Sequence, residues 1–162
     1  MSAGMHHVAY ACRDVEATHR FYHEVLELEL VHVELNRFQG GWFRHLFYDL
    51  GGGAALAFFD LHGCGEPTPL KTSVSTDLGL PLWVNHLALR VDDATQKRLR
   101  EKLVAAGHKI VMDFDHGWCF SVYVRDPNGI LVELCADKPG GIPIDPAEAL
   151  RRMRGLPEGV SS

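Results

Sequence analysis

Apolar and polar positions in the first part of the chain alternate with two periods, one typical of strands and one typical of a helix. Residues 5–11 form a short run of apolar and aromatic residues, which predicts a strand. Asp14 follows at an N-cap position, and the apolar residues after it recur at helical spacing. Three further strands are predicted at 28–35, 42–50 and 54–60. The first half is therefore expected to fold in the order β-α-β-β-β.

The second half repeats this order after a loop that contains several prolines. A strand, a helix and three more strands are predicted in turn, at residues 84–91, 94–106, 108–113, 119–126 and 130–136. Residues 7–9 align with residues 86–88, and both halves have the same spacing around the glycine of their last hairpin turn. We infer an internal repeat of about 75–80 residues, so positions can be compared between the two halves.

The length and the repeat together predict one domain built from two modules. A chain of 162 residues has the size of a single domain, which is roughly 100–200 residues. We place this domain at 1–137, with module one at 4–61, a connecting loop at 62–82 and module two at 83–137. The remaining tail, residues 138–162, is predicted to contain a short helix.

The composition is that of a soluble globular protein with an acidic balance. Hydrophobic residues make up 46% and charged residues 23%, and the net charge is −5. An acidic chain lacks the basic face that nucleic-acid binding needs. No run of residues reaches the ~18–20 apolar positions of a membrane span, and the N-terminal segment lacks the apolar core of a signal peptide. These features predict a cytoplasmic protein with no nucleic-acid or membrane partner.

The cysteines and histidines indicate which kinds of disulfide or metal site the chain could contain. The four cysteines show no CxxC spacing, and most of them lie in apolar runs. We interpret them as reduced buried thiols, not as a zinc knuckle or a disulfide framework. The chain also contains ten histidines, an excess that prompts a search for a metal site.

Three residues stand out once the two halves are compared: His7, His86 and Glu133. The two histidines occupy the same place on the first predicted strand of each module, and Glu133 lies on the last predicted strand of the second. A lone strand histidine is more often a core or edge residue, and a lone strand glutamate more often faces solvent. A carboxylate within an apolar strand, however, is costly to bury unless it is paired or binds a cation. The two histidines at equivalent positions of the repeat, together with this glutamate, favour a two-histidine, one-carboxylate metal site with open positions over a closed structural zinc site.

Several stretches of the sequence resemble the vicinal oxygen chelate superfamily, which includes glyoxalase I, methylmalonyl-CoA epimerase, extradiol dioxygenases, and bleomycin- and fosfomycin-resistance proteins. Together they span about residues 5–136. The main stretches are His6-His7-Val8-Ala9-Tyr10, Asn85-His86-Leu87-Ala88-Leu89-Arg90-Val91-Asp92-Asp93 and Phe120-Ser121-Val122-Tyr123-Val124-Arg125-Asp126-Pro127-Asn128-Gly129-Ile130-Leu131-Val132-Glu133-Leu134. The resemblance implies an α+β fold in which two βαβββ modules in tandem form a curved mixed sheet cup that holds a metal.

In that superfamily four strand positions can supply metal ligands, and the resemblance places them at His7, Ala57, His86 and Glu133. Ala57 has no ligand atom, which counts against glyoxalase-type members because these usually supply four protein ligands. Extradiol dioxygenases use two histidines and a glutamate, and they carry a tyrosine at the spacing that separates Tyr123 from Glu133. The resemblance therefore implies that Tyr123 hydrogen-bonds the bound substrate. A strand tyrosine is also commonly a half-buried packing residue.

One feature of the dioxygenases has no match. The additional histidine that those enzymes place upstream of the second ligand falls on Lys71. Two substitutes could act as acid or base. His45 shares a face with Phe47, the repeat equivalent of Tyr123, and His116 lies in the loop before the strand that carries Tyr123. A surface or loop role explains either histidine equally well.

We therefore expect a divalent-metal enzyme, under three hypotheses. The first is an extradiol-type ring-cleaving dioxygenase that acts on a small vicinal diol with Fe(II) or Mn(II), although Zn(II), Ni(II) or Co(II) also suit these donors. The second is a lyase or isomerase of the glyoxalase or epimerase type, in which the metal is a Lewis acid. The third is a small-molecule binding or resistance protein. All three predict a small-molecule ligand, of which an aromatic diol is one option, and the superfamily makes a homodimer an expected assembly.

Overall fold

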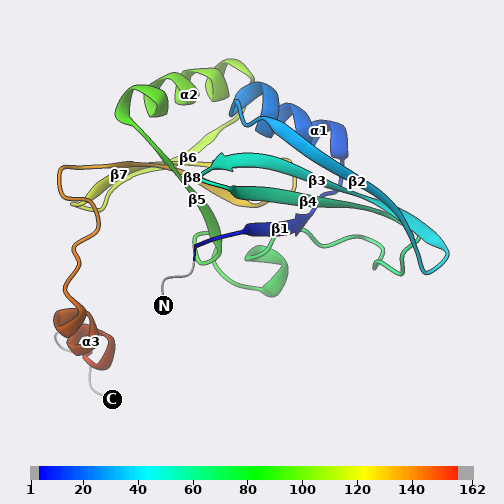
Figure 1. Cartoon of the computed structure of the whole chain (residues 1–162). Helices are drawn as coiled ribbons and strands as arrows, with labels where there is room; N and C mark the ends of the chain where they lie inside the picture. The colour runs from blue at the N-terminus through cyan, green and yellow to red at the C-terminus, as the bar shows by residue number, and fades with distance from the viewer. Residues whose placement is uncertain (1–3, 157–162) are drawn as a thin grey trace.

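The computed structural model describes residues 4–156 and contains the predicted order of elements twice (Figure 1). The first module consists of a strand, a helix with one π-helical turn, and three strands: β1 (His7–Ala11), α1 (Val15–His19), η1 (Arg20–Val25), β2 (Leu30–Phe38), β3 (Gly41–Gly51) and β4 (Ala54–His62). The second module follows the same plan: β5 (His86–Val91), α2 (Asp93–Ala105), β6 (Ile110–Asp115), β7 (Cys119–Arg125) and β8 (Leu131–Asp137). The α+β fold of two βαβββ modules is thus confirmed.

Each module forms its own four-stranded mixed sheet. The strand orders are β1-β4-β3-β2 and β5-β8-β7-β6, and in both sheets the first strand runs parallel to the last. The register supports the alignment of the two halves, because Phe47 pairs with Ala57 in the first sheet and Tyr123 pairs with Glu133 in the second. The predicted strand boundaries shift by a few residues. β2 extends to Phe38, since the outer strand stays paired with β3 up to the hairpin turn.

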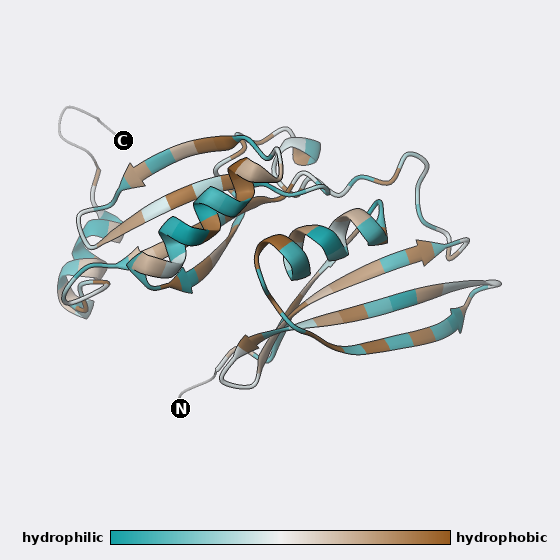
Figure 2. Cartoon of the chain, turned by 90° about the horizontal axis from the view of Figure 1, so that it is seen from above, coloured by the Kyte–Doolittle hydropathy of each residue, from teal (hydrophilic) through white to brown (hydrophobic). Residues whose placement is uncertain are grey.

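The core lies on the face of each sheet that the helices cover. Figure 1 shows α1 and α2 on the same side of the two sheets, and Figure 2 shows the alternation of apolar and polar residues along the strands. Side chains from both modules, among them Tyr22, Phe58, Val132 and Leu134, form one buried cluster. Each such side chain stabilises the fold by roughly 1.5–3 kcal/mol. The opposite face of each sheet carries the residues predicted to form the site.

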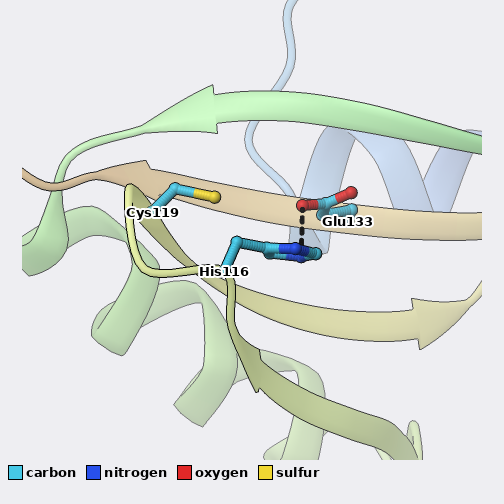
Figure 3. A group of neighbouring side chains, drawn as sticks. All are labelled: His116, Cys119 and Glu133. Atoms are coloured by element: carbon cyan, nitrogen blue, oxygen red, sulfur yellow. Dashed lines mark ion pairs between the residues drawn. The ribbon is translucent and has the colours of Figure 1, made fainter. Parts of the chain in front are cut away.

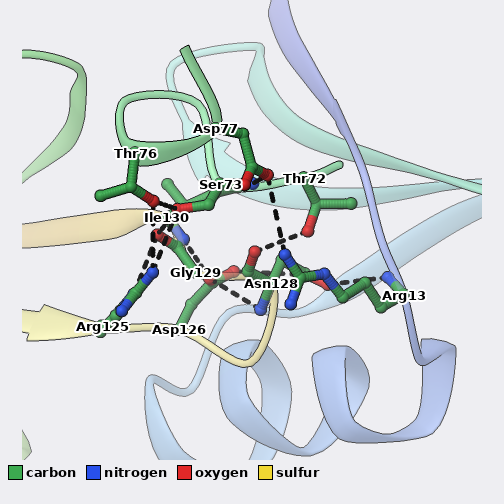
Figure 4. Close-up of polar contacts among 10 residues, drawn as sticks. All are labelled: Arg13, Thr72, Ser73, Thr76, Asp77, Arg125, Asp126, Asn128, Gly129 and Ile130. Carbon is green, nitrogen blue, oxygen red and sulfur yellow. Dashed lines mark hydrogen bonds and ion pairs between the residues drawn. The ribbon is translucent and has the colours of Figure 1, made fainter. Parts of the chain in front are cut away.

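The hairpin turn between β7 and β8 also connects the two modules. Asp126 accepts a hydrogen bond from the Tyr22 hydroxyl at 3.0 Å, and Asn128 Oδ1 accepts one from the backbone N–H of Arg13 at 3.0 Å. In the loop before β5, Thr72 donates to the Asn128 carbonyl and Ser73 donates to the Gly129 carbonyl (Figure 4). The turn that the sequence predicts is therefore a hub that joins three segments of the chain.

The remaining described residues form short elements outside the two sheets. The loop between the modules contains one 3-10 turn, η2 (Thr76–Leu78), and the tail contains the helix α3 (Pro146–Arg154), which begins at the Asp145 N-cap. In residues 4–156 no helix is long and apolar enough to cross a membrane.

Candidate metal centre

Glu133 is a buried carboxylate on the open face of the second sheet, with an exposed fraction of 5%. Its strand β8 lies between β5 and β7, so neighbours reach it from both sides. Ser121 Oγ donates a hydrogen bond to Oε1 at 2.5 Å, and His86 Nε2 lies 3.0 Å from Oε2. Within residues 4–156 no lysine or arginine pairs with Glu133. A buried carboxylate needs a compensating positive charge, and the chain supplies only imidazoles for it.

The orientation of the His86 ring shows where the positive charge that compensates Glu133 must lie. Its Nδ1 lies 3.0 Å from the backbone carbonyl oxygen of Trp83, and because a carbonyl only accepts, Nδ1 carries the proton. In the neutral ring Nε2 then presents a lone pair to the carboxylate of Glu133. Two acceptors at 3.0 Å require a proton or a metal cation between them. Metal-binding histidines are commonly held in this way by a carbonyl at the other ring nitrogen.

His116 and Tyr123 lie on the other side of the same carboxylate. His116 Nε2 is 3.0 Å from the Tyr123 hydroxyl and 4.0 Å from Glu133 Oε1. Burial, together with the negative charge of Glu133, raises the pKa of Tyr123 to about 12. The phenol is therefore protonated at neutral pH and acts as a hydrogen-bond donor. The two predicted residues thus adjoin the predicted ligands His86 and Glu133.

Cys119 is a neighbour that the sequence comparison did not assign to the site. It is fully buried, and its sulfur lies 3.6 Å from Ser121 Oγ. One potential ligand atom from each of His116, Cys119 and Glu133 lies within 4.8 Å of the other two (Figure 3). Alternation along β7 could have revealed it, because Cys119, Ser121 and Tyr123 are two residues apart and share one face.

His7 lies on the first sheet, apart from the other two predicted ligands. Its ring packs 5.8 Å from Phe47 and 6.2 Å from His45, measured between ring centroids, and its Nδ1 lies 2.7 Å from Nδ1 of His6. In the described part of the chain, no hydrogen bond or ion pair joins His7 to His86 or Glu133. Two members of the predicted triad are therefore adjacent, and the third belongs to the equivalent face of the other module.

His45 also lies on the open face of the first sheet, as its spacing from Phe47 predicts. Its ring stacks on Phe59 with 3.8 Å between centroids, and its Nδ1 lies 3.4 Å from Oε2 of Glu34. Its Nε2 is buried and has no hydrogen-bond partner among residues 4–156. Burial lowers the pKa of His45, so the ring tends toward its neutral form. The carboxylate partner Glu34 was missed from the sequence, because an irregularity in β2 after Leu30 shifts its pairing register.

The chain belongs to the Glyoxalase/Bleomycin resistance protein/Dioxygenase superfamily, since the model of that family matches residues 4–134. As its name says, this superfamily includes glyoxalases, bleomycin resistance proteins and dioxygenases. Comparison with curated protein sequences finds no match.

Solved structures with the same fold include proteins of several activities. A glyoxylase/bleomycin resistance protein/dioxygenase domain from Frankia sp. EAN1pec is 23% identical, with a TM-score of 0.63, and the alignment covers 86% of this chain and 96% of that one. Glyoxalase I from Leishmania major is 19% identical, with a TM-score of 0.61 and coverage of 94% and 98%. A variant of the fosfomycin resistance protein FosX from Listeria monocytogenes, in complex with Mn(II) and 1S,2S-dihydroxypropylphosphonic acid, is 18% identical, with a TM-score of 0.59 and coverage of 85% and 95%. These similarities establish the fold.

Proposed function

We propose that this protein is a divalent-metal-dependent enzyme that acts on a small substrate with two adjacent oxygen atoms. The observation that carries the proposal is the His86–Glu133 pair, in which the imidazole Nε2 lies 3.0 Å from a buried carboxylate while its Nδ1 is held by a backbone carbonyl. A divalent cation between these groups satisfies both of them and removes the cost of the buried charge. When bound, the cation supplies a Lewis acid that polarises the substrate oxygens.

The third ligand in this proposal is His7, supplied by a second copy of the chain. His7 lies on the open face of the first sheet, and His86 and Glu133 lie on the open face of the second. The helix-covered faces of the two modules already pack on one core within the chain. The open faces are therefore available to meet those of another copy, and a symmetric homodimer would create two equivalent sites.

The chemistry best supported by the side chains is proton transfer without a redox step, as in a lyase or isomerase. His45 offers an unpartnered ring nitrogen, and Glu34 at the other nitrogen holds the ring orientation and stabilises its protonated form. The Tyr123 hydroxyl, protonated at neutral pH, can donate to a substrate oxygen. Glyoxalase I and the Mn(II) complex of FosX, among the structural neighbours, are consistent with this class.

The four cysteines are free thiols, which favours a cytoplasmic location.

A second candidate function, ring cleavage by an extradiol-type dioxygenase with Fe(II) or Mn(II), is favoured by one contact. His116 Nε2 lies 3.0 Å from the Tyr123 hydroxyl, beside Glu133. This pair could accept a proton from a bound aromatic diol and position the ring. The alanine at position 57 leaves the fourth protein ligand absent, as in those enzymes.

Metal analysis of protein purified without chelators tests the metal site. We expect stoichiometric metal in the wild-type protein and none in Glu133→Gln, which keeps the shape of the side chain and removes its charge. Glu34→Gln is the matched control on the first sheet and should keep the metal. Equal metal content in the wild-type protein and Glu133→Gln would contradict the proposal.

Turnover under two conditions separates the reaction classes. Activity on diols, epoxides or 2-oxoaldehyde adducts with Zn(II) under anaerobic conditions supports proton transfer. Oxygen consumption with catechols that depends on Fe(II) supports ring cleavage instead. Metal-loaded protein that binds these compounds without converting any of them would identify a binding or resistance protein.

A further inference from the structure

His116, Cys119 and Glu133 form a cluster of three different ligand types on the open face of the second sheet (Figure 3). One nitrogen, one sulfur and one oxygen atom lie within 4.8 Å of one another. Bonds of about 2.0–2.3 Å to a tetrahedral cation would place such atoms roughly 3.3–3.8 Å apart. The cluster therefore needs only a small contraction to surround a cation.

The two oxygens of Glu133 face different partners. Oε2 faces His86, whereas Oε1 accepts the Ser121 hydrogen bond and is the oxygen nearest to His116. A cation held by His116 and Cys119 would therefore use Oε1, on the opposite side of the carboxylate from His86. Ser121 can keep its hydrogen bond to the second lone pair of Oε1 and orient the carboxylate.

The cysteine at this position is specific to the second module. Cys119 precedes Tyr123 by four residues, and the equivalent position before Phe47 in the first module is Phe43. The Cys119 thiol is free and fully buried, with Glu133 as an acidic neighbour and no lysine or arginine paired to either group in residues 4–156. One thiolate and one carboxylate together balance the charge of a divalent cation, which makes burial of both groups favourable.

A route from solvent is also present. The His116 side chain is 31% exposed, and it lies in the loop between β6 and β7 next to Gly117, whose φ is +85°. Cys119 and Glu133 are fixed on adjacent strands. The exposed imidazole is thus the ligand that can adjust as a cation enters, and in doing so its Nε2 would exchange the contact with the Tyr123 hydroxyl for the cation.

We propose that this chain binds a thiophilic divalent cation, of the Zn(II) or Co(II) type, through His116 Nε2, Cys119 Sγ and Glu133 Oε1. The site uses neither His7 nor His86 and needs no second copy of the chain. It shares only Glu133 with the metal site of the proposed function. A soft sulfur donor beside harder nitrogen and oxygen donors selects Zn(II) or Co(II) over Mg(II) or Mn(II).

Titration of the full-length, metal-free, reduced protein with Co(II) tests the site, because cobalt–thiolate ligation gives an intense near-ultraviolet charge-transfer band. We expect the band in the wild-type protein, its loss in Cys119→Ser and its retention in Cys64→Ser, a control free thiol in the loop after β4. His86→Ala should retain the band. His116→Asn should keep the band but require more cobalt to reach it. If Cys119→Ser does not fold, this higher cobalt requirement tests the site instead, and an unchanged requirement in His116→Asn would contradict it.

Other outcomes overturn the proposal. Cobalt bound without the band would exclude Cys119 as a ligand and leave the His7, His86 and Glu133 site intact. A band that disappears in Cys135→Ser and persists in Cys119→Ser would show that Cys135, and not Cys119, is the sulfur ligand. A band lost together with bound cobalt in His86→Ala would show that no separate site exists. No cobalt binding at all, in any variant, would contradict both metal sites.

Discussion

The Nδ1 atom of His45 lies 3.4 Å from Oε2 of Glu34, and this contact determines which nitrogen of the ring is available for chemistry. A carboxylate accepts hydrogen bonds and donates none, so Nδ1 carries the proton, and the lone pair of the neutral ring is at Nε2, the buried atom without a partner among residues 4–156. Burial lowers the pKa of His45, and the negative charge of Glu34 opposes that effect. The balance between these influences keeps the ring able to accept and return a proton.

The first prediction concerns this pair. In the metal-free protein, Glu34→Gln should lower the pKa of His45 further, because the substitution removes the charge that stabilises the imidazolium. Histidine resonances followed by NMR across a pH titration measure the change. Asp93→Asn, on the exposed end of α2, is the control and should leave the His45 titration unchanged. A His45 pKa that rises or stays constant in Glu34→Gln would show that the contact does not form in solution.

A second prediction links the metal to stability. A divalent cation that binds only the folded protein should raise its free energy of unfolding, by about 2.7 kcal/mol at roughly 100 times the dissociation constant. Glu133→Gln should lose this increase, and in the metal-free state it should be no less stable than the wild-type protein, because it removes a buried charge. Urea unfolding with and without metal measures both effects. An equal metal-induced increase in the variant would rule out Glu133 as a ligand.

The third prediction concerns the hub at the β7–β8 turn. Asp126 accepts hydrogen bonds from the backbone N–H groups of Asn128 and Ile130 and from the Tyr22 hydroxyl. Asp126→Ala leaves these buried donors unpaired and should cost about 3 kcal/mol of stability. Asp113→Ala, which removes an exposed ion pair, should cost at most about 1 kcal/mol. Chemical denaturation compares the two, and similar losses would mean that the turn is not a structural hub.

A fourth prediction concerns the pH dependence of stability. His108 packs against Phe21 with 4.9 Å between ring centroids, and burial lowers its pKa. The unfolded chain therefore takes up the proton at higher pH than the folded one, so stability is complete above the unfolded pKa of about 6.5 and falls as the pH decreases through the folded pKa. His108→Gln should flatten this part of the profile. Unfolding free energies measured from neutral to mildly acidic pH test it, and an unchanged slope would exclude His108.

The sequence predicts the modules well because each depends on local periodicity and on the repeat. The equal spacing from Phe47 to Ala57 and from Tyr123 to Glu133 becomes the same cross-strand pairing in both sheets. The placement of His7 apart from Glu133 could not be predicted in this way. It depends on how the helix-covered faces of the two modules pack on a common core, which involves contacts between residues far apart in the sequence.

The alternation of apolar and polar residues also did not predict every side-chain neighbour in the site. Ser121 and Tyr123 follow from strand alternation. Cys119 shares their face of β7, but a cysteine in an apolar strand is equally typical of a buried structural thiol. Glu34 could not be placed, because the register of β2 against β3 shifts near its start. A shift of one residue moves a side chain to the other face of a sheet.

The contacts of the β7–β8 turn divide the long connection between the modules into two parts with different tolerance to change. From Thr72 onward the connection is tied to the turn, and Ser75 Oγ accepts a hydrogen bond from the backbone N–H of Asn85, the residue before His86. An insertion here would displace the histidine from Glu133. The earlier part, 65–70, has no such ties to the turn among the described residues, and added length there should be accommodated at a cost that grows only slowly with loop size. Variation in length among natural or engineered versions of this chain should therefore concentrate in the earlier part.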